Sequence, residues 1–381
     1  MRWILLFAAL SLTAAAQDVP PPTIEQLMAD ANAHYLKRDY AGSRQLYERS
    51  RALIEQTPAE NPQHFDVMKR LSTVAAAAGD YPASNTYLAA AIAWRAERFG
   101  DSDPQVMTER LHQVGIYRAM GDGAGAREAL NAIIAKHEEI GGRRNPDLAN
   151  DHSLMGQIDL DAHQKKEAVQ QFQLAILLRN IATGPLDVTQ VPDLDRLGTL
   201  YIDKEILDYR QAEDVFRRAL IIRESVLGAE HADLLATLDG LAYSYFGQQK
   251  YPEAEAAYQR LIALWTKSVG ETHPMLAVAL DKLAVFYAAQ KRHEEARTAF
   301  ERANAIRALV MAQGLVREAD DSRTNSDPPD FSNALYQRAL HALEPSNALY
   351  DWLHEAIEGV LEPADPATAA AKKASKTGSK K

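Results

Sequence analysis

The sequence predicts an all-α protein built from stacked helix hairpins, and three observations lead to this fold class. Matching residues recur about every 42 residues along most of the 381-residue chain. Within each interval, apolar residues follow the i, i+3, i+4, i+7 spacing of an amphipathic helix. Glycine (19) and proline (17) are scarce for a fold rich in strands and tight turns. Together these observations predict one extended array rather than several globular domains.

Two columns of residues define where the helices of each hairpin cross. The small residues are Ser43, Ser84, Ala126, Ala168, Ala212, Ala254 and Ala296. Four positions later come the large residues Tyr47, Leu88, Leu130, Phe172, Phe216, Tyr258 and Phe300. We expect the small residue to let two antiparallel helices approach closely. We expect the large residue to pack over this crossing and into the next hairpin.

Two further columns mark the junctions between hairpins. The junction glycines are Gly100, Gly142, Gly184, Gly228 and Gly270. Glycine suits this place because the residue that closes a helix often adopts a left-handed conformation. Three residues later come Asp103, Asn145, Asp187, His231 and His273, which are expected to open the next helix. The equivalence of His231 and His273 indicates turn geometry rather than metal ligation.

These residues carry a family resemblance. Leu241, Ala242 and Tyr245, followed by Tyr251-Pro-Glu-Ala and Tyr258, resemble the tetratricopeptide repeat. The 42-residue period and the junction Gly-Glu-Thr-His-Pro at 270–274 resemble its kinesin-light-chain subtype. The resemblance covers about residues 23–312. It implies an α-solenoid, a right-handed superhelix of about seven helix hairpins, which binds peptides or protein segments in its concave groove.

The first segment of the chain predicts export. Residues 1–16 combine Arg2, an apolar run and the small residues Ala14 to Ala16, which are the three parts of a Sec-type signal peptide. We therefore expect cleavage after Ala16 and a periplasmic or secreted protein without a transmembrane segment. Retention of the segment as an uncleaved anchor is the alternative, although its apolar run is short for a membrane span.

The repeat domain is predicted to occupy residues 17–312, and the C-terminal end differs from it. Residues 313–330 lose the period and are expected to form a solvated linker. Residues 331–361 are expected to form a helix pair that caps the last repeat, or else a separate docking element. The second of these helices, near 346–361, places on one face Leu349, Trp352, Leu353, Ile357 and Val360.

Residues 362–381 form a Lys/Ala-rich tail that is predicted to be disordered. Its lysines outnumber its two acidic residues, Glu362 and Asp365, whereas the whole chain has a net charge of -10. Three roles remain open for this basic tail: weak contact with anionic surfaces, contact with the acidic groove of the repeats, or no role beyond solubility.

Composition and motifs argue against an enzyme, a bound cofactor or a metal. The chain has no cysteine, which excludes thiolate zinc sites, iron–sulfur clusters and cysteine nucleophiles. Its negative charge argues against nucleic acid as a partner. The glycine run at 121–126 resembles a dinucleotide-binding motif but has no strand before it, so it is interpreted as an inter-helix turn. Catalytic, cofactor-binding and metal-binding residues are therefore predicted to be absent.

A candidate peptide-binding groove follows from the repeat register. Asp195, Asp239 and Asp281 occupy the same point on the first helix of three successive repeats. Neighbouring groove positions are expected to hold Gln157, Thr199 and Tyr243. One hypothesis is an acidic track for a basic or amide-rich peptide. The other is a groove wall whose carboxylates pair with local residues such as Arg196 and Lys282.

The predicted function is a non-enzymatic scaffold for protein–protein interaction in the bacterial cell envelope. Its partner is expected to be a protein or peptide segment of unknown identity. Two alternatives remain: a structural solenoid that associates with further copies of itself, and an auxiliary subunit of an envelope enzyme or secretion complex.

Overall fold

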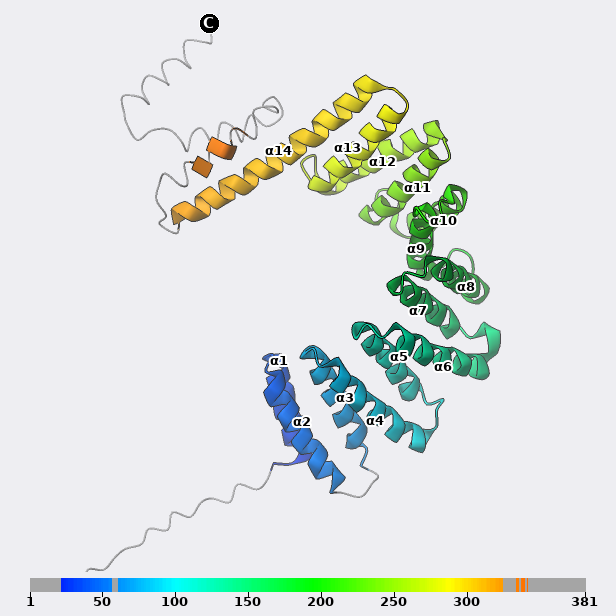
Figure 1. Ribbon diagram of the computed structural model, residues 1–381, viewed down its shortest axis with the longest axis vertical. Coiled ribbons are helices and arrows are strands. Elements are labelled where there is room, and N and C mark those ends of the chain that lie inside the picture. Colours follow the sequence, from blue (N-terminus) through cyan, green and yellow to red (C-terminus); the bar gives the residue numbers. More distant parts are fainter. Residues whose placement is uncertain (1–21, 57–60, 325–333, 336, 340, 342–381) are drawn as a thin grey trace, which may run out of the picture. The chain divides into compact units, whose positions relative to one another are not determined.

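The computed structural model describes residues 22–56, 61–324, 334–335, 337–339 and 341. These residues form fourteen α-helices and three short 3-10 helices without a strand, which confirms the all-α prediction (Figure 1). None of the described helices is long and apolar enough to cross a membrane. The predicted signal peptide, the helix near 346–361 and the basic tail lie outside the described residues.

The chain divides into two compact units, and the first comprises residues 1–163. Its helices are α1 (Ile24–Leu36), α2 (Tyr40–Glu55), α3 (Gln63–Ala77), α4 (Tyr81–Phe99), α5 (Pro104–Ala119), α6 (Gly123–Gly141), η1 (Gly142–Arg144) and α7 (Asp147–Asp161). The pairs α1 with α2, α3 with α4 and α5 with α6 pack as hairpins, and each also contacts the next helix in sequence. The glycine run lies around the turn between α5 and α6, as interpreted from the sequence.

The second unit comprises residues 164–381 and repeats the same packing. Its helices are α8 (Lys165–Thr183), η2 (Val188–Gln190), α9 (Val191–Ile202), α10 (Tyr209–Leu227), η3 (Ala232–Leu234), α11 (Leu235–Gly247), α12 (Tyr251–Val269), α13 (Pro274–Ala289) and α14 (His293–Thr324). The pairs α9 with α10, α11 with α12 and α13 with α14 form hairpins. The remaining pair of the register, α7 and α8, is divided between the units.

The small residues of the repeat column lie at the helix crossings, as predicted. Those from Ser43 to Ala254 are fully buried. Phe216 shows why the crossings need small residues, because its ring fills the space where side chains would stand on Gly198 of α9 and Gly240 of α11. One large ring therefore occupies the gap that two glycines leave, and the helices pack closely around it.

The junction columns also behave as predicted. The five junction glycines end their helices with positive φ values, from +59° at Gly142 to +94° at Gly184. Asp103 accepts hydrogen bonds from the backbone N–H groups of Gln105 and Val106 at the start of α5. His273 accepts one from Met275 at the start of α13, which confirms that this imidazole serves the turn.

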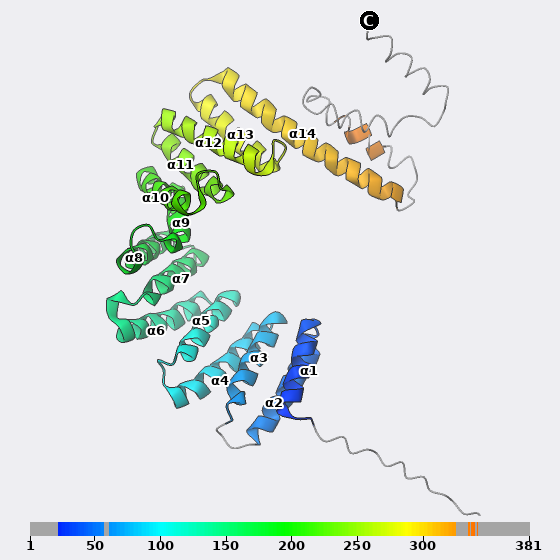
Figure 2. The same cartoon turned by 180° about the vertical axis from the view of Figure 1, so that it is seen from behind.

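Two expectations for the last repeat are wrong. α14 runs on to Thr324, so residues 313–324 are helical and not part of a linker (Figure 2). This extension is stabilised because Leu309, Ala312 and Ala319 pack against Leu335 and Ala339. The last large residue of the repeat column, Phe300, is not packed into a next hairpin: 49% of its surface is exposed.

Candidate functional site

A recurring basic position connects successive hairpins. Arg95, His137, Arg179, Arg223 and Arg307 occupy it on the second helix of their repeats, while the sixth repeat has Trp265 there instead. The position fourteen residues further on lies on the first helix of the next repeat. It holds the buried residues Glu109, Asp151, Asp193, Thr237 and Ala279.

Two members of this register form buried ion pairs. His137 Nδ1 lies 2.6 Å from a carboxylate oxygen of Asp151, and Arg179 pairs with Asp193 in the same way. Burial raises the pKa of the Asp151 carboxyl, while the hydrogen bond from His137 acts in the opposite direction. A buried carboxylate without a partner would be costly, so each pair helps to fix the second helix against the next repeat.

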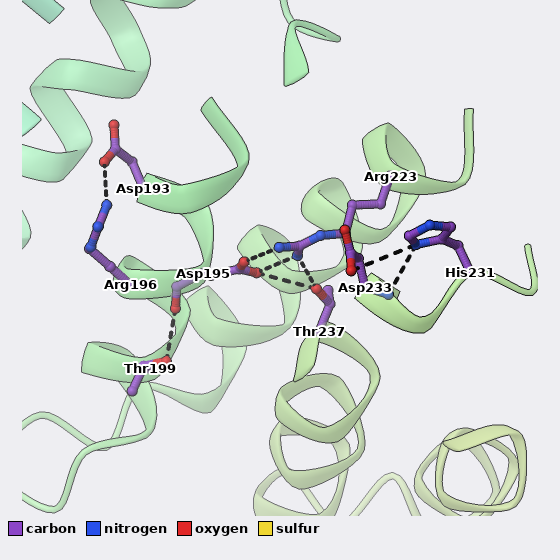
Figure 3. Close-up of polar contacts among 8 residues, drawn as sticks. All are labelled: Asp193, Asp195, Arg196, Thr199, Arg223, His231, Asp233 and Thr237. Atoms are coloured by element: carbon purple, nitrogen blue, oxygen red, sulfur yellow. Dashed lines mark hydrogen bonds and ion pairs between the residues drawn. The ribbon is translucent and has the colours of Figure 1, made fainter. Parts of the chain in front are cut away.

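The register shifts in the fifth repeat. Arg223 faces Thr237, a neutral residue, where the preceding repeats place a carboxylate. Its guanidinium donates to the hydroxyl of Thr237 and makes two hydrogen bonds to Asp195 of α9, at 2.9 and 2.6 Å (Figure 3). Arg223 therefore links the first helix of its own repeat to the first helix of the next.

In the sixth repeat the ion pair is replaced by apolar residues, and a hollow forms there. Trp265 and Ala279 stand where Arg179 and Asp193 stand two repeats earlier. They line a depression of about 610 Å³ between α11, α12 and α13, together with Leu261, Val269 and Met275. Trp265 is held by stacking on His273, with ring centroids 5.6 Å apart and an interplanar angle of 12°. This volume lies within the usual range of ligand pockets.

A second, smaller hollow adjoins the first. It measures about 220 Å³, and its lining includes Tyr243, Tyr258 and Val285. Both hollows share Val278 and Lys282 of α13, so they form one continuous surface, which we call the α13 groove. Burial raises the pKa of the Tyr258 hydroxyl, so this floor residue stays neutral.

Three of the six residues that were predicted from the sequence to form a peptide-binding groove line the α13 groove. Asp239 and Tyr243 line it, and Asp281 lines its smaller hollow. Asp195 and Thr199 lie on α9, where Thr199 is exposed and its hydroxyl donates to the backbone oxygen of Asp195. The sixth candidate, Gln157, lies on α7 in the first unit.

The three aspartates are ion-paired within the chain. Besides the pair of Asp195 with Arg223, Asp239 accepts from Lys282 at 2.5 Å. Asp281 accepts two hydrogen bonds from Arg307, at 2.7 and 3.1 Å. Each of the three carboxylates therefore has a cationic partner, although Arg196 pairs with Asp193 rather than with its neighbour Asp195 (Figure 3).

Comparison with known proteins identifies the repeats. The tetratricopeptide repeat family matches residues 208–233 and 234–308. Residues 208–308 carry tetratricopeptide repeats. The two matched segments contain every residue that lines the α13 groove, from Arg223 to Val285. No curated protein matches the chain.

Two solved structures share this fold with TM-scores above 0.5. The apo form of RapI is 14% identical, with a TM-score of 0.55, and the match covers 84% of this chain and 85% of RapI. The C-terminal part of a repeat protein from Cytophaga hutchinsonii is 13% identical, with a TM-score of 0.53 and coverage of 73% and 95%. A third match, to the repeats of a kinesin light chain from Podosopora anserina, is 16% identical, with a TM-score of 0.46 and coverage of 55% and 99%.

Sequence reasoning missed the two residues that open the groove of these tetratricopeptide repeats. Trp265 fits the apolar spacing of its helix, and Ala279 is an ordinary residue for a helix crossing. Their signal lies only in the comparison between repeats, where an aromatic and a methyl group replace a charged pair. Among the described residues, no group of three or more His, Asp or Glu side chains is arranged to hold a metal ion.

Proposed function

We propose that this protein binds an extended segment of a partner protein in the α13 groove, with an apolar side chain of the partner inserted beside Trp265. One observation carries the proposal: the hollow occurs where two earlier repeats place a buried ion pair. A packed core gains nothing from such a gap, because unfilled apolar surface forfeits dispersion and transfer energy. An occupant would restore both.

The groove has the chemistry of a peptide site. Met275, Val278 and Val285 are exposed along α13, with 45%, 42% and 62% of their surfaces accessible. The half-exposed pair of Asp239 and Lys282 lies between the two hollows, where it can form hydrogen bonds with a peptide backbone. Apolar anchors set between a few polar groups are the usual composition of such interfaces.

A variant that fills the hollow but keeps the fold tests the proposal. The double variant Trp265→Arg/Ala279→Asp recreates the pair that Arg179 and Asp193 form two repeats earlier. Peptides selected on the wild-type protein from a random phage-displayed library would be measured by isothermal titration. We expect them to carry a large apolar side chain and to bind the double variant at least tenfold more weakly.

Circular dichroism and thermal unfolding serve as the folding controls. Ile181→Asp is the matched control for surface chemistry, because Ile181 is 58% exposed on α8 and does not line the groove. Equal binding of the selected peptides to the wild type and to a folded double variant would refute the proposed site.

A second candidate function, self-association, is favoured by another surface. Leu177 and Ile181 on α8 and Ile221 on α10 are all at least half exposed. Side chains of this kind often mark protein contacts when they gather on one face. Sedimentation of the protein over a concentration series tests this candidate, and a monomer throughout would exclude it.

We also propose export to the cell envelope, with residues 1–16 as the signal peptide. The proposal is supported by the order of Arg2, the apolar run and the three alanines. Mass determination of the protein's N-terminus after expression in its host is the test. A chain that begins at Gln17 is expected, and one that keeps residues 1–16 would contradict cleavage.

A further inference from the structure

The last hairpin leaves a core position uncovered. The large residues of the repeat column from Tyr47 to Tyr258 expose at most 3% of their surfaces. Phe300 occupies the same register on α14, yet it is 49% exposed. The type of residue does not explain this difference, because tyrosine, leucine and phenylalanine are all buried elsewhere in the column. The difference in exposure depends on whether a further hairpin follows in the chain and covers the residue.

The next hairpin normally covers this residue. The Phe216 ring lies against Gly240 of α11, the first helix of the following repeat. Tyr258 packs against Phe286 of α13, with ring centroids 5.6 Å apart. The helical residues described after α14 contact Leu309, Ala312 and Ala319, and no first helix of a further repeat occurs among the described residues, so the face around Phe300 has no cover from a repeat.

The uncovered face extends along α14. Phe300, Asn304, Arg307 and Met311 recur at helical spacing, and Met311 is 56% exposed. An adjacent face of the same helix is covered, because Leu335 and Ala339 are buried against Leu309, Ala312 and Ala319. The chain thus returns to α14 after leaving it at Thr324.

We propose that residues 346–361 of the same chain cover Phe300 and Met311 as a helix, in the place that the first helix of a next repeat would take. The segment begins five residues after His341, the last described residue, and His341 follows the contact made by Ala339. Its apolar residues share one helical face and include Leu353 and Ile357. A tethered segment also has a high effective concentration, which favours it over a second copy of the chain.

Crosslinking distinguishes residues 346–361 of the same chain from a second copy of the chain as the cover of Phe300. The chain has no cysteine, so Asn304→Cys with Ala356→Cys creates one defined pair for a short bismaleimide. We expect a link within the monomer that forms several-fold faster than in the matched control, Arg302→Cys with Ala356→Cys, since Arg302 lies on the opposite side of α14. Linked dimers would assign the face to a second copy, and equal rates for both pairs would also overturn the proposal.

The coupling in Tm between Phe300 and the apolar face of residues 346–361 gives an independent test. In the full chain, Phe300→Ala should lower Tm by several degrees because it removes a covered ring. The same substitution should have little effect in a chain that carries Leu353→Asp and Ile357→Asp, where the cover is already lost. Additive shifts in Tm would show that residues 346–361 do not lie on Phe300. Because neither set of variants touches the α13 groove, failure here leaves the proposed function standing.

Discussion

Arg223 forms its ion pair backward with Asp195, 28 residues earlier, and makes only a neutral hydrogen bond forward to the hydroxyl of Thr237. In the preceding repeat the equivalent Arg179 pairs forward with Asp193. The direction changes because Thr237 supplies a hydroxyl and no charge, while Asp195 supplies a carboxylate on the adjacent helix. Arg223 thus contacts both helices, but its anion lies on α9.

The first prediction concerns this pair. Arg223 and Asp195 are mostly buried, with 16% and 26% of their side chains exposed, so solvent screens their attraction only in part. Removing Asp195 leaves a mostly buried cation without its anion, and Asp195→Ala should lower the free energy of unfolding by about 1–3 kcal/mol. Urea denaturation of both single variants and the double variant measures the coupling.

Thr237→Asp is the rescue control for this prediction. It places a carboxylate where the preceding repeats have one, so it should restore most of the stability that Asp195→Ala removes. A coupling near zero between Arg223 and Asp195, or no rescue by Thr237→Asp, would contradict the switch in direction.

The hairpin register could be predicted from the sequence because it rests on short-range periodicity and on glycine at positive φ. The charge pairing could not. Lys282 follows Asp281 directly but pairs with Asp239 on another helix, because neighbouring residues on a helix point in different directions.

The end of the repeats was mispredicted for a related reason. Asp320 and Asp321 made residues 313–330 look like a linker, whereas α14 includes both of them. The stabilising contacts come from Leu335 and Ala339, which are more than a dozen residues away in the sequence. Local polarity carries no information about such contacts.

The second prediction compares two equivalent carboxylates. Asp193→Asn should cost about 3–5 kcal/mol, because it leaves the guanidinium of Arg179 charged and buried without its anion. Asp151→Asn should cost much less at neutral pH, because an imidazole, unlike a guanidinium, needs no anion and can donate a hydrogen bond to the new amide oxygen. Urea denaturation at pH 7 measures both. Equal losses would contradict this account of the register.

The third prediction is a pH dependence that arises from Asp151. Burial raises the pKa of its carboxyl above the ordinary 3.8, so the folded chain holds this proton more tightly than the unfolded chain. This difference in proton affinity stabilises the folded chain. The stabilisation is fully present below the pKa of the carboxyl in the unfolded chain, and it is lost as pH rises through the pKa in the folded chain. His137 on α6 and Asp147 and His152 on α7 are the charged groups that act on it.

Asp151→Asn removes this titration and therefore isolates it. The free energy of unfolding of the wild type minus that of Asp151→Asn should fall as pH rises from about 3.5 to about 7. A difference that is flat or that increases over this range would show that burial does not control the carboxyl.

The last prediction distinguishes two physical reasons why a position requires glycine: its backbone conformation and the lack of space for a side chain. Gly270 ends α12 at φ +88° and ψ 170°, and a Cβ there would meet no atom within 4 Å, so the cost of Gly270→Ala is backbone strain alone, about 1–3 kcal/mol. Gly240 has an ordinary helical backbone, but a Cβ there would collide with the Phe216 ring. Gly240→Ala should therefore cost about 2–3 kcal/mol through this collision, unless the ring is made smaller. Phe216→Leu should reduce the cost of Gly240→Ala and leave that of Gly270→Ala unchanged. Thermal unfolding of these variants, alone and combined, measures both costs, and a Gly240→Ala cost that is independent of residue 216 would mean that the ring does not set the helix spacing.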